Sequence, residues 1–237
     1  RAVQICLYRL AMRSNRFVVF QNPDDRRFFV ERGIVKEFQA EVVSGSGVDL
    51  ERYPRAPLPI GTFTFLMIAR LIREKGVEVF LRAAELMGGE KEVKFVLVGG
   101  LDPNPGGLSQ AEILGGKGNV EWVGEQSDVV PFIRNCHCFV LPSYYREGIP
   151  RSILEAMAVG RPVITTDSVG CRETVEEGEN GWKIPVRDHE ALAGAMLEAL
   201  SLSREELQRR GDHSRRLAED RFDVDLVNAQ LIKWVLE

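Results

Sequence analysis

The chain has 237 residues, of which 44% are hydrophobic and 28% charged, a composition typical of a globular protein that buries a substantial core. Its formal net charge of −4 argues against a nucleic-acid-binding protein, which usually carries a basic excess. No apolar run reaches the roughly 18 to 20 residues that a membrane-spanning helix needs.

The first 60 residues are predicted to be the end of a larger domain. Strands are expected at 17–20 and 40–44, with a helix at 23–32 between them. One β-α-β unit is too small to make a stable sheet by itself. We therefore interpret residues 1–60 as the C-terminal remnant of an N-terminal domain plus a proline-rich linker. The start at Arg1 rather than Met favours a cut within a longer chain, and no signal-peptide pattern follows it.

Residues 61–221 alternate between strand and helix patterns. The strands are predicted at 62–69, 93–98, 119–123, 138–141, 162–165 and 182–184. The helices are predicted at 76–87, 128–135, 152–159, near 171–176, at 188–201 and from 203 onward. This alternation predicts right-handed βαβ units and an α/β fold with a Rossmann-like, doubly wound parallel sheet. Residues 222–237 carry an apolar stripe at helical spacing, which predicts a helix that packs back toward the N-terminal domain.

The cysteines and histidines do not predict a metal site. Cys136, His137 and Cys138 are adjacent, but side chains alternate across a strand, so the two cysteines would share one face and His137 the other. None of the four cysteines forms a C-x-x-C pair. We expect reduced thiols, a cytoplasmic protein, and neither a metal nor another cofactor.

Two cations follow the first strand of the predicted sheet. Arg70 and Lys75 are five positions apart at a strand end that opens a helix. A bend there would bring both onto one diphosphate, whose developing negative charge they would stabilise. A loop with ordinary solvated charges explains the same pattern equally well.

Two carboxylates flank the strand-to-helix turn after residues 138–141. Glu147 and Glu155 lie eight positions apart, at the kind of strand end where α/β sheets collect ligands beside helix N-termini that favour anions. Gly148 has no side chain to keep a ligand oxygen from its amide. Alternatively, Ser152-x-x-Glu155 is only a capping box, or the two acids are a glycosidase pair.

In combination, these segments resemble the C-terminal, donor-binding domain of the retaining "glycosyltransferase group 1" enzymes, which are glycogen synthase-like and have the GT-B architecture of two Rossmann-like domains. The matching segments are Arg70 with Lys75, Gly99-Gly100, the 120–124 strand, Asp128, Leu141-Pro142-Ser143, Glu147 with Glu155, Ala156-Met157-Ala158, Gly160, Pro162-Val163-Ile164 and Glu179-Asn180-Gly181. The likeness covers roughly residues 62–200. Tyr144-Tyr145-Arg146 and Gly170-Cys171-Arg172-Glu173 further resemble transferases of bacterial surface polysaccharides or lipid-linked oligosaccharides.

The resemblance implies a role for each matching residue. Arg70 and Lys75 would hold the donor diphosphate, Glu147 the transferred sugar, and Glu155 the ribose hydroxyls. Backbone groups would complete the donor site, and these belong to Gly99, Val123, Gly124, Glu125, Gln126, Gly148, Ile149 and Pro150. The family's reaction keeps the anomeric configuration and usually needs no metal.

The expected substrates are a nucleotide-diphosphate sugar, with UDP favoured, and a glycan or lipid-linked acceptor bound by the N-terminal domain that the chain lacks. The chain alone is expected to be inactive. The alternatives are a nucleotide-sugar epimerase of the same architecture and a non-catalytic nucleotide-binding module. Peripheral contact of the full-length protein with the inner face of the membrane stays open.

Overall fold

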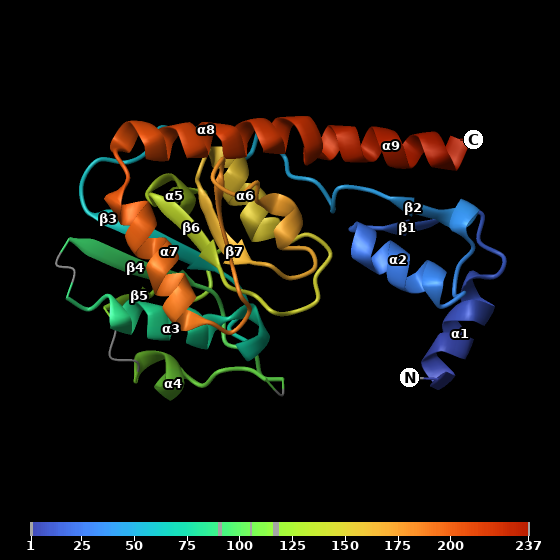
Figure 1. Ribbon diagram of the computed structural model, residues 1–237, viewed down its shortest axis with the longest axis horizontal. Coiled ribbons are helices and arrows are strands. Elements are labelled where there is room, and N and C mark those ends of the chain that lie inside the picture. The colour runs from blue at the N-terminus through green and yellow to red at the C-terminus, as the bar shows by residue number, and fades with distance from the viewer. Residues whose placement is uncertain (1, 90–91, 105, 116–118, 237) are drawn as a thin grey trace.

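The computed structural model describes residues 2–89, 92–104, 106–115 and 119–236. The chain forms a small N-terminal unit and a larger α/β domain, and helices α8 and α9 run along both (Figure 1). The positions at the chain ends, 1 and 237, were part of the domain predictions and lie outside the described residues.

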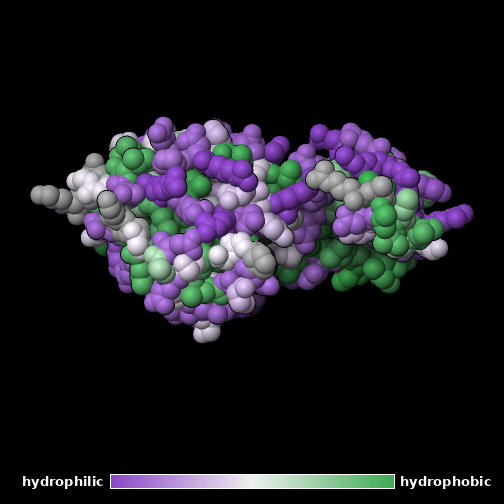
Figure 2. Space-filling model, turned by 90° about the horizontal axis from the view of Figure 1, so that it is seen from below, coloured by the Kyte–Doolittle hydropathy of each residue, from purple (hydrophilic) through white to green (hydrophobic). Residues whose placement is uncertain are grey.

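The N-terminal unit contains a two-stranded parallel sheet. It consists of α1 (Ala2–Met12), β1 (Val18–Phe20), α2 (Pro23–Glu31), η1 (Glu37–Gln39) and β2 (Ala40–Val42), with β1 paired to β2. A separate small core of Phe20, Ile34, Val35 and Ala40 holds this unit together. Helix α1 was not predicted from the sequence, and several of its apolar side chains stay exposed. Figure 2 shows apolar side chains gathered on this unit, and the exposed ones on α1 and η1 include Val3, Leu7, Leu10 and Phe38.

The larger domain contains a six-stranded, all-parallel sheet in the order β5-β4-β3-β6-β7-β8. The strands are β3 (Phe63–Ile68), β4 (Val93–Val98), β5 (Val120–Trp122), β6 (Cys138–Leu141), β7 (Val163–Thr166) and β8 (Gly181–Ile184). Strands β6 and β7 are buried along their whole length, as expected for inner strands of a parallel sheet covered on both faces, although β7 ends in the polar residues Thr165 and Thr166. The predicted doubly wound α/β fold is confirmed.

The helices and 3-10 turns that follow β3 lie mainly against the two faces of the sheet. They are η2 (Arg73–Lys75), α3 (Val77–Leu86), α4 (Gln110–Leu114), α5 (Val130–Arg134), α6 (Arg151–Val159), η3 (Arg172–Thr174), α7 (His189–Ser201), α8 (Arg204–Arg221) and α9 (Val224–Leu236). Right-handed crossovers in opposite directions from the sheet centre put α3 and α6 on opposite faces. Accordingly, α3 packs against α7, and α6 packs against α5 and α8. The helix expected near 171–176 is only the short 3-10 turn η3.

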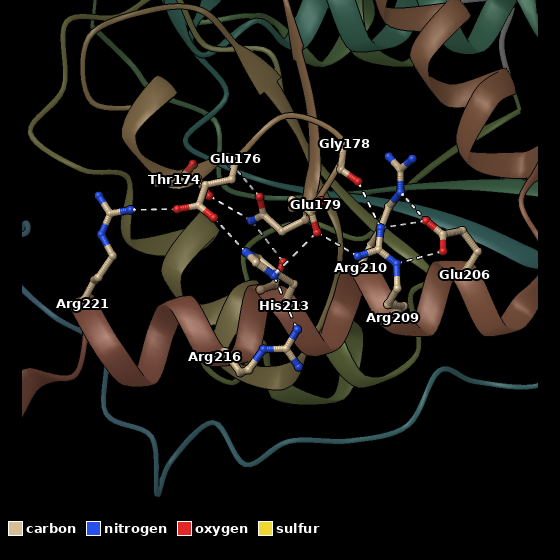
Figure 3. A network of polar contacts seen from close by, with 12 residues as sticks. Thr174, Glu176, Gly178, Glu179, Glu206, Arg209, Arg210, His213, Arg216 and Arg221 are labelled. Carbon is tan, nitrogen blue, oxygen red and sulfur yellow. Dashed lines mark hydrogen bonds and ion pairs between the residues drawn. The ribbon is translucent and has the colours of Figure 1, made fainter.

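Charged side chains fasten α8 to the loop between η3 and β8 (Figure 3). His213 Nε2 lies 2.8 Å from Glu176 Oε2, and Arg209 Nη1 lies 2.8 Å from Glu179 Oε2. Asn180 is buried under this network and donates to the Thr174 carbonyl at 3.0 Å. The Glu179-Asn180-Gly181 segment therefore has a structural use away from the predicted ligand site.

Candidate functional site

The strand order reverses between β3 and β6, which start the two halves of the sheet and are paired side by side. In doubly wound folds, the crevice at the carboxyl ends of two such strands is where ligands bind. Arg70 and Lys75 follow β3, whereas Glu147 follows β6 and Glu155 lies on the next helix, α6. The topology alone therefore directs these four residues to one place.

An open cleft of about 470 Å³ lies at this point, and Arg70, Lys75, Glu147 and Glu155 all line it. Its other lining residues are Arg52, Tyr53, Ile68, Ala69, Val98, Gly99, Gly100, Glu125, Gln126, Ser127, Val129, Pro150, Arg151 and Ser152. The four side chains selected from the sequence thus share one hollow. Two of them are cationic and two are anionic, as recognition of a charged, hydroxyl-rich ligand requires.

Lys75 and Glu147 form an ion pair in this cleft, with Nζ 2.5 Å from Oε2, and the two side chains are 14% and 11% exposed. Ser143 Oγ donates to the other carboxylate oxygen, Oε1, at 2.8 Å. The pair depends on Gly76, which follows Lys75 in a left-handed conformation with φ 79°. A Cβ at Gly76 would lie 2.1 Å from the Pro142 carbonyl oxygen, so a side chain there would push the two loops apart.

Arg70 also lines the cleft and is 63% exposed. Asp102 holds it through an Oδ2–Nη1 contact of 3.2 Å. Hydrogen bonds from the backbone and side chain of Asn104, together with Arg70, keep the pKa of Asp102 below its ordinary value. Asp102 therefore stays charged at neutral pH, and Arg70 keeps most of its guanidinium available to a ligand.

Glu155 faces the cleft instead of capping its helix. Helix α6 has Pro150 as its N-cap, and no side chain bonds there, so the capping-box alternative is wrong. The Glu155 side chain is 14% exposed, and burial raises its pKa, although a hydrogen bond from Tyr53 and the charge of Arg151 oppose that rise. The α6 N-terminus thus meets the cleft without a side-chain cap, which leaves its positive end to an anion.

The predicted backbone contacts divide into two groups. Gly99, Glu125, Gln126 and Pro150 line the cleft. The remaining four are described by the structure but lie outside the lining, and they are Val123, Gly124, Gly148 and Ile149. The Gly124 carbonyl accepts from the Gly99 amide at 2.9 Å, so it supports the strand end behind the cleft. A direct contact of these four with donor stays a prediction.

The space beside Gly148 is occupied by the N-terminal unit. A Cβ at Gly148 would lie 1.7 Å from Gln21 Oε1, so the missing side chain makes room for Gln21 and not, as we expected, for a ligand. Next to it, buried Asn22 donates from Nδ2 to the Glu147 carbonyl at 3.1 Å. Arg146 also pairs with Asp25 at 2.8 Å. Contacts from the N-terminal unit therefore hold the loop that carries Glu147 in place.

The sequence did not identify Arg52, Tyr53, Ser127 or Arg151 as cleft residues. Arg52 and Tyr53 lie in the segment between the two parts, where the prolines predict a linker and no periodicity indicates which side chains turn inward. The sequence contains only a weak sign that this segment turns inward, because Tyr53, beside Pro54, is an aromatic residue and such residues are unusual in a solvated linker. Arg151 and Ser152 lie at the start of the helix predicted at 152–159, although a place in the cleft was not predicted for them.

Within the described residues, no group of three or more His, Cys, Asp or Glu side chains is arranged to hold a metal ion. The described cysteines are all free thiols, and Cys136, Cys138 and Cys171 are buried. His137 stacks on Phe63 at 4.8 Å and accepts from the Thr64 amide, so it packs in the fold. Among the described helices, none has both the length and the apolar character to cross a bilayer.

Several known proteins are similar to this chain. It is 30% identical over 244 residues to a Campylobacter jejuni protein named N,N'-diacetylbacillosaminyl-diphospho-undecaprenol alpha-1,3-N-acetylgalactosaminyltransferase, covering 96% of this chain and 62% of that protein. A Staphylococcus aureus capsular polysaccharide biosynthesis glycosyltransferase is 28% identical over 171 residues, or 71% of this chain and 44% of that protein. The chain therefore spans less than two thirds of these relatives.

Solved structures share the fold. Sucrose-phosphate synthase from Thermosynechococcus elongatus superposes with a TM-score of 0.83 at 24% identity, covering 98% of this chain and 61% of that one. Anabaena HepE, solved with UDP and glucose, gives 0.82 at 22% identity and covers 98% of this chain and 67% of that one. A family profile described as "Glycosyl transferases group 1" matches residues 54–216, which include the whole cleft apart from Arg52 and Tyr53. The chain belongs to the family of group 1 glycosyl transferases.

Proposed function

We propose that this chain is the donor-binding part of a retaining glycosyltransferase that moves a hexose or N-acetylhexosamine from a nucleotide-diphosphate sugar, with UDP favoured, to a glycan or lipid-linked acceptor. One observation carries the proposal. The cleft at the switch point holds two cations, Arg70 and Lys75, together with two acids, Glu147 and Glu155. A sugar nucleotide has matching groups, because its charged diphosphate lies between two polyols.

The diphosphate would lie between Arg70 and Lys75, near the uncapped start of α6. Its negative charge would compete with Glu147 for the Lys75 ammonium, since the two are paired without ligand. Glu147 would then be free to accept hydrogen bonds from the hydroxyls of the sugar. The pair lines the cleft, so a phosphate bound there can reach the Lys75 ammonium although both side chains are largely buried.

In the reaction, the bond between the anomeric carbon and the phosphate oxygen breaks as the acceptor hydroxyl attacks on the leaving-group face. The acceptor oxygen forms the new bond, and its proton passes to the departing phosphate. Arg70 and Lys75 would stabilise the charge that builds up on that phosphate, which is the term that most lowers such barriers. These cations do the work that a divalent metal does elsewhere, so we expect a chelator to leave the activity unchanged.

The nucleoside would occupy the other end of the cleft. Glu155 would accept from the ribose hydroxyls, and backbone at Gly99, Glu125 and Gln126 would contact the base. UDP is favoured because the resemblance to transferases of surface polysaccharides and lipid-linked oligosaccharides points to UDP-N-acetylhexosamines. The neighbour HepE was solved with UDP.

The acceptor would bind to a part of the protein that lies outside this chain. The N-terminal unit supplies only two strands, which is too little for a second substrate domain. A lipid-linked acceptor fits the Campylobacter jejuni relative, whose name includes a diphospho-undecaprenol substrate. On this proposal, the chain alone binds donor weakly, transfers little, and belongs to a protein that works on the cytoplasmic face of a membrane.

Calorimetric titration of the full-length protein with UDP, GDP and their sugar conjugates tests the assignment. We expect Lys75→Ala to weaken diphosphate binding and Glu155→Ala to weaken nucleoside binding. Unchanged affinity in both variants would overturn the site. With donor and acceptor both present, a glycosylated acceptor supports transfer. Epimerised free donor would instead support an epimerase, and binding without turnover would support a non-catalytic module.

A further inference from the structure

Ser143 follows strand β6 and is fully buried. It is not among the residues that line the cleft, although Glu147, four positions later, is one of them. A hydroxyl at this depth costs free energy unless groups of the protein satisfy its hydrogen bonds. The partners of the Ser143 hydroxyl therefore indicate what this side chain does.

Three groups lie within hydrogen-bonding distance of Ser143 Oγ. The Tyr145 amide donates to it at 3.2 Å, while Glu147 Oε1 at 2.8 Å and the Glu74 carbonyl oxygen at 3.2 Å can each accept from it. A serine hydroxyl has only one proton to give. The shorter distance and the charge of the carboxylate both favour Glu147 as the acceptor. The hydroxyl proton is therefore directed at Glu147.

The backbone of Ser143 is held separately, by the neighbouring strand β7. Its carbonyl accepts hydrogen bonds from the hydroxyls of Thr166, the last residue of β7, and of Ser168, the latter at 3.0 Å. Thr166 is fully buried, and its Oγ1 lies 2.9 Å from Ser168 Oγ. These contacts use the carbonyl of Ser143 and leave its side chain to Glu147. The hydroxyl thus approaches Glu147 from a fixed position.

The two oxygens of the Glu147 carboxylate have different partners. Oε2 pairs with Lys75 Nζ at 2.5 Å, whereas Oε1 accepts from Ser143. Lys75 lines the cleft, so a bound diphosphate can draw its ammonium away, but Ser143 lies outside the lining and keeps its contact. Rotation about the last bond of a glutamate side chain is only weakly restricted. Once Lys75 is engaged elsewhere, the bond from Ser143 opposes that rotation.

We propose that Ser143 is a positioning residue, which keeps the Glu147 carboxylate oriented toward the transferred sugar after the diphosphate has taken Lys75. This inference rests on the proposed function, in which Glu147 holds the sugar hydroxyls. It adds a residue from behind the cleft to the sugar end of the site. Because the nucleotide is held by other groups, the effect of Ser143 should be confined to the sugar.

Calorimetry of the full-length protein tests this role with two probes. They are UDP and the UDP-sugar that the unmodified protein binds most tightly among UDP-glucose, UDP-N-acetylglucosamine and UDP-N-acetylgalactosamine. In Ser143→Ala, the affinity for the UDP-sugar should fall about 10-fold, the order of one hydrogen bond to a charged group, while the affinity for UDP stays nearly unchanged. Ser143→Cys replaces the hydroxyl by a weakly donating thiol and should act in the same direction by a smaller factor.

Ser214→Ala is the matched control. Ser214 lies on α8 and is also fully buried, and its Oγ accepts from Asn180 Nδ2 at 3.3 Å. The substitution removes the same atom as Ser143→Ala, but from a residue that does not line the cleft and bonds none of its acids. It should leave the affinities for UDP and for the UDP-sugar unchanged.

A double-mutant cycle supplies a readout that a purely structural role of Ser143 would not move. In a Glu147→Ala background, Ser143→Ala should have no further effect on the affinity for the UDP-sugar, because the group that it positions is gone. A structural loss, for example at the Tyr145 amide, would instead weaken binding of the UDP-sugar by the same factor with or without Glu147.

The other outcomes overturn the inference. If Ser143→Ala keeps its affinity for the UDP-sugar, weakens UDP and the UDP-sugar equally, or acts independently of Glu147, then Ser143 does not position the acid, although the proposed function stands. If Glu147→Ala itself leaves the affinity for the UDP-sugar unchanged, Glu147 does not hold the sugar and Ser143 has nothing to orient. If the unmodified protein binds no nucleotide, the proposed function itself fails.

Discussion

The ammonium of Lys75 and the carboxylate of Glu147 lie 2.5 Å apart in side chains that are 14% and 11% exposed, whereas Lys94 and Glu121 lie at the same 2.5 Å with 50% and 51% exposure. These two lysine–glutamate pairs are therefore equal in length but lie in different surroundings. A largely desolvated pair interacts more strongly and costs more to break than an exposed one, which contributes at most about 1 kcal/mol.

Lys75→Ala should weaken UDP binding by about 100-fold, or roughly 2.7 kcal/mol, because it removes one of the two cations proposed to hold the diphosphate. It should also lower the free energy of unfolding, since Glu147 is left without its counter-charge. Calorimetry and urea unfolding measure the two effects. Lys94→Ala, the matched control, should change neither. Equal behaviour of both variants would show that the cleft pair has no special role.

Glu155→Gln should separate binding from stability. Burial raises the pKa of Glu155, so the ionised carboxylate destabilises the fold. The favourable contribution of Glu155 to the free energy of unfolding is therefore present at low pH, where the acid is neutral, and is lost as the pH rises through that raised pKa. The neutral glutamine should therefore unfold at a higher temperature than the unmodified protein at pH 7, and this advantage should shrink as the pH falls. UDP affinity should nevertheless drop about 10-fold. A variant that is less stable at pH 7 would contradict this account of Glu155.

Asn22→Ala tests the link from the N-terminal unit to the site. Asn22 caps α2, accepting from the Asp25 amide at 2.7 Å, and also donates to the Glu147 carbonyl. Its loss should cost about 1 kcal/mol of cap stability and, in addition, lower the affinity for the UDP-sugar but hardly for UDP. Asp188→Ala removes the cap of α7, which bonds the Ala191 amide at 2.8 Å far from the cleft. The Asp188→Ala variant should lose stability but keep its affinity for the UDP-sugar.

Arg161→Lys should destabilise the protein by about 3 kcal/mol. The Arg161 guanidinium is fully buried and serves the carbonyls of Ile133, Arg134, Ala56, Pro57 and Gly160, more acceptors than an ammonium at this depth can satisfy. Arg204 makes fewer such bonds, because it donates to the Pro59 carbonyl in an exposed contact and to the Leu58 carbonyl in a partly buried one. Arg204→Lys should change the urea midpoint little, and a similarly small effect of Arg161→Lys would contradict the inferred role.

Much of the fold followed from periodicity, since strands such as β4 and β6 are buried apolar runs with loops at both ends. The chemistry of the cleft followed because the topology fixes where strand ends meet. The place of Tyr53 in the cleft did not follow, because its segment is held by hydrogen bonds from Arg161 and Arg215, which are more than 100 residues away. The crowding of Gln21 against Gly148 was equally out of reach, since it joins segments that are more than 100 residues apart in the sequence.

A crystal structure of the protein with UDP tests the central claim most directly. The account predicts diphosphate oxygens within hydrogen-bonding distance of Lys75 Nζ and the Arg70 guanidinium, with the ribose on Glu155 and the Lys75–Glu147 pair opened. Nucleotide bound elsewhere, for example in the hollow between Glu78 and Glu112, or in this cleft but with its phosphates away from both cations, would contradict it.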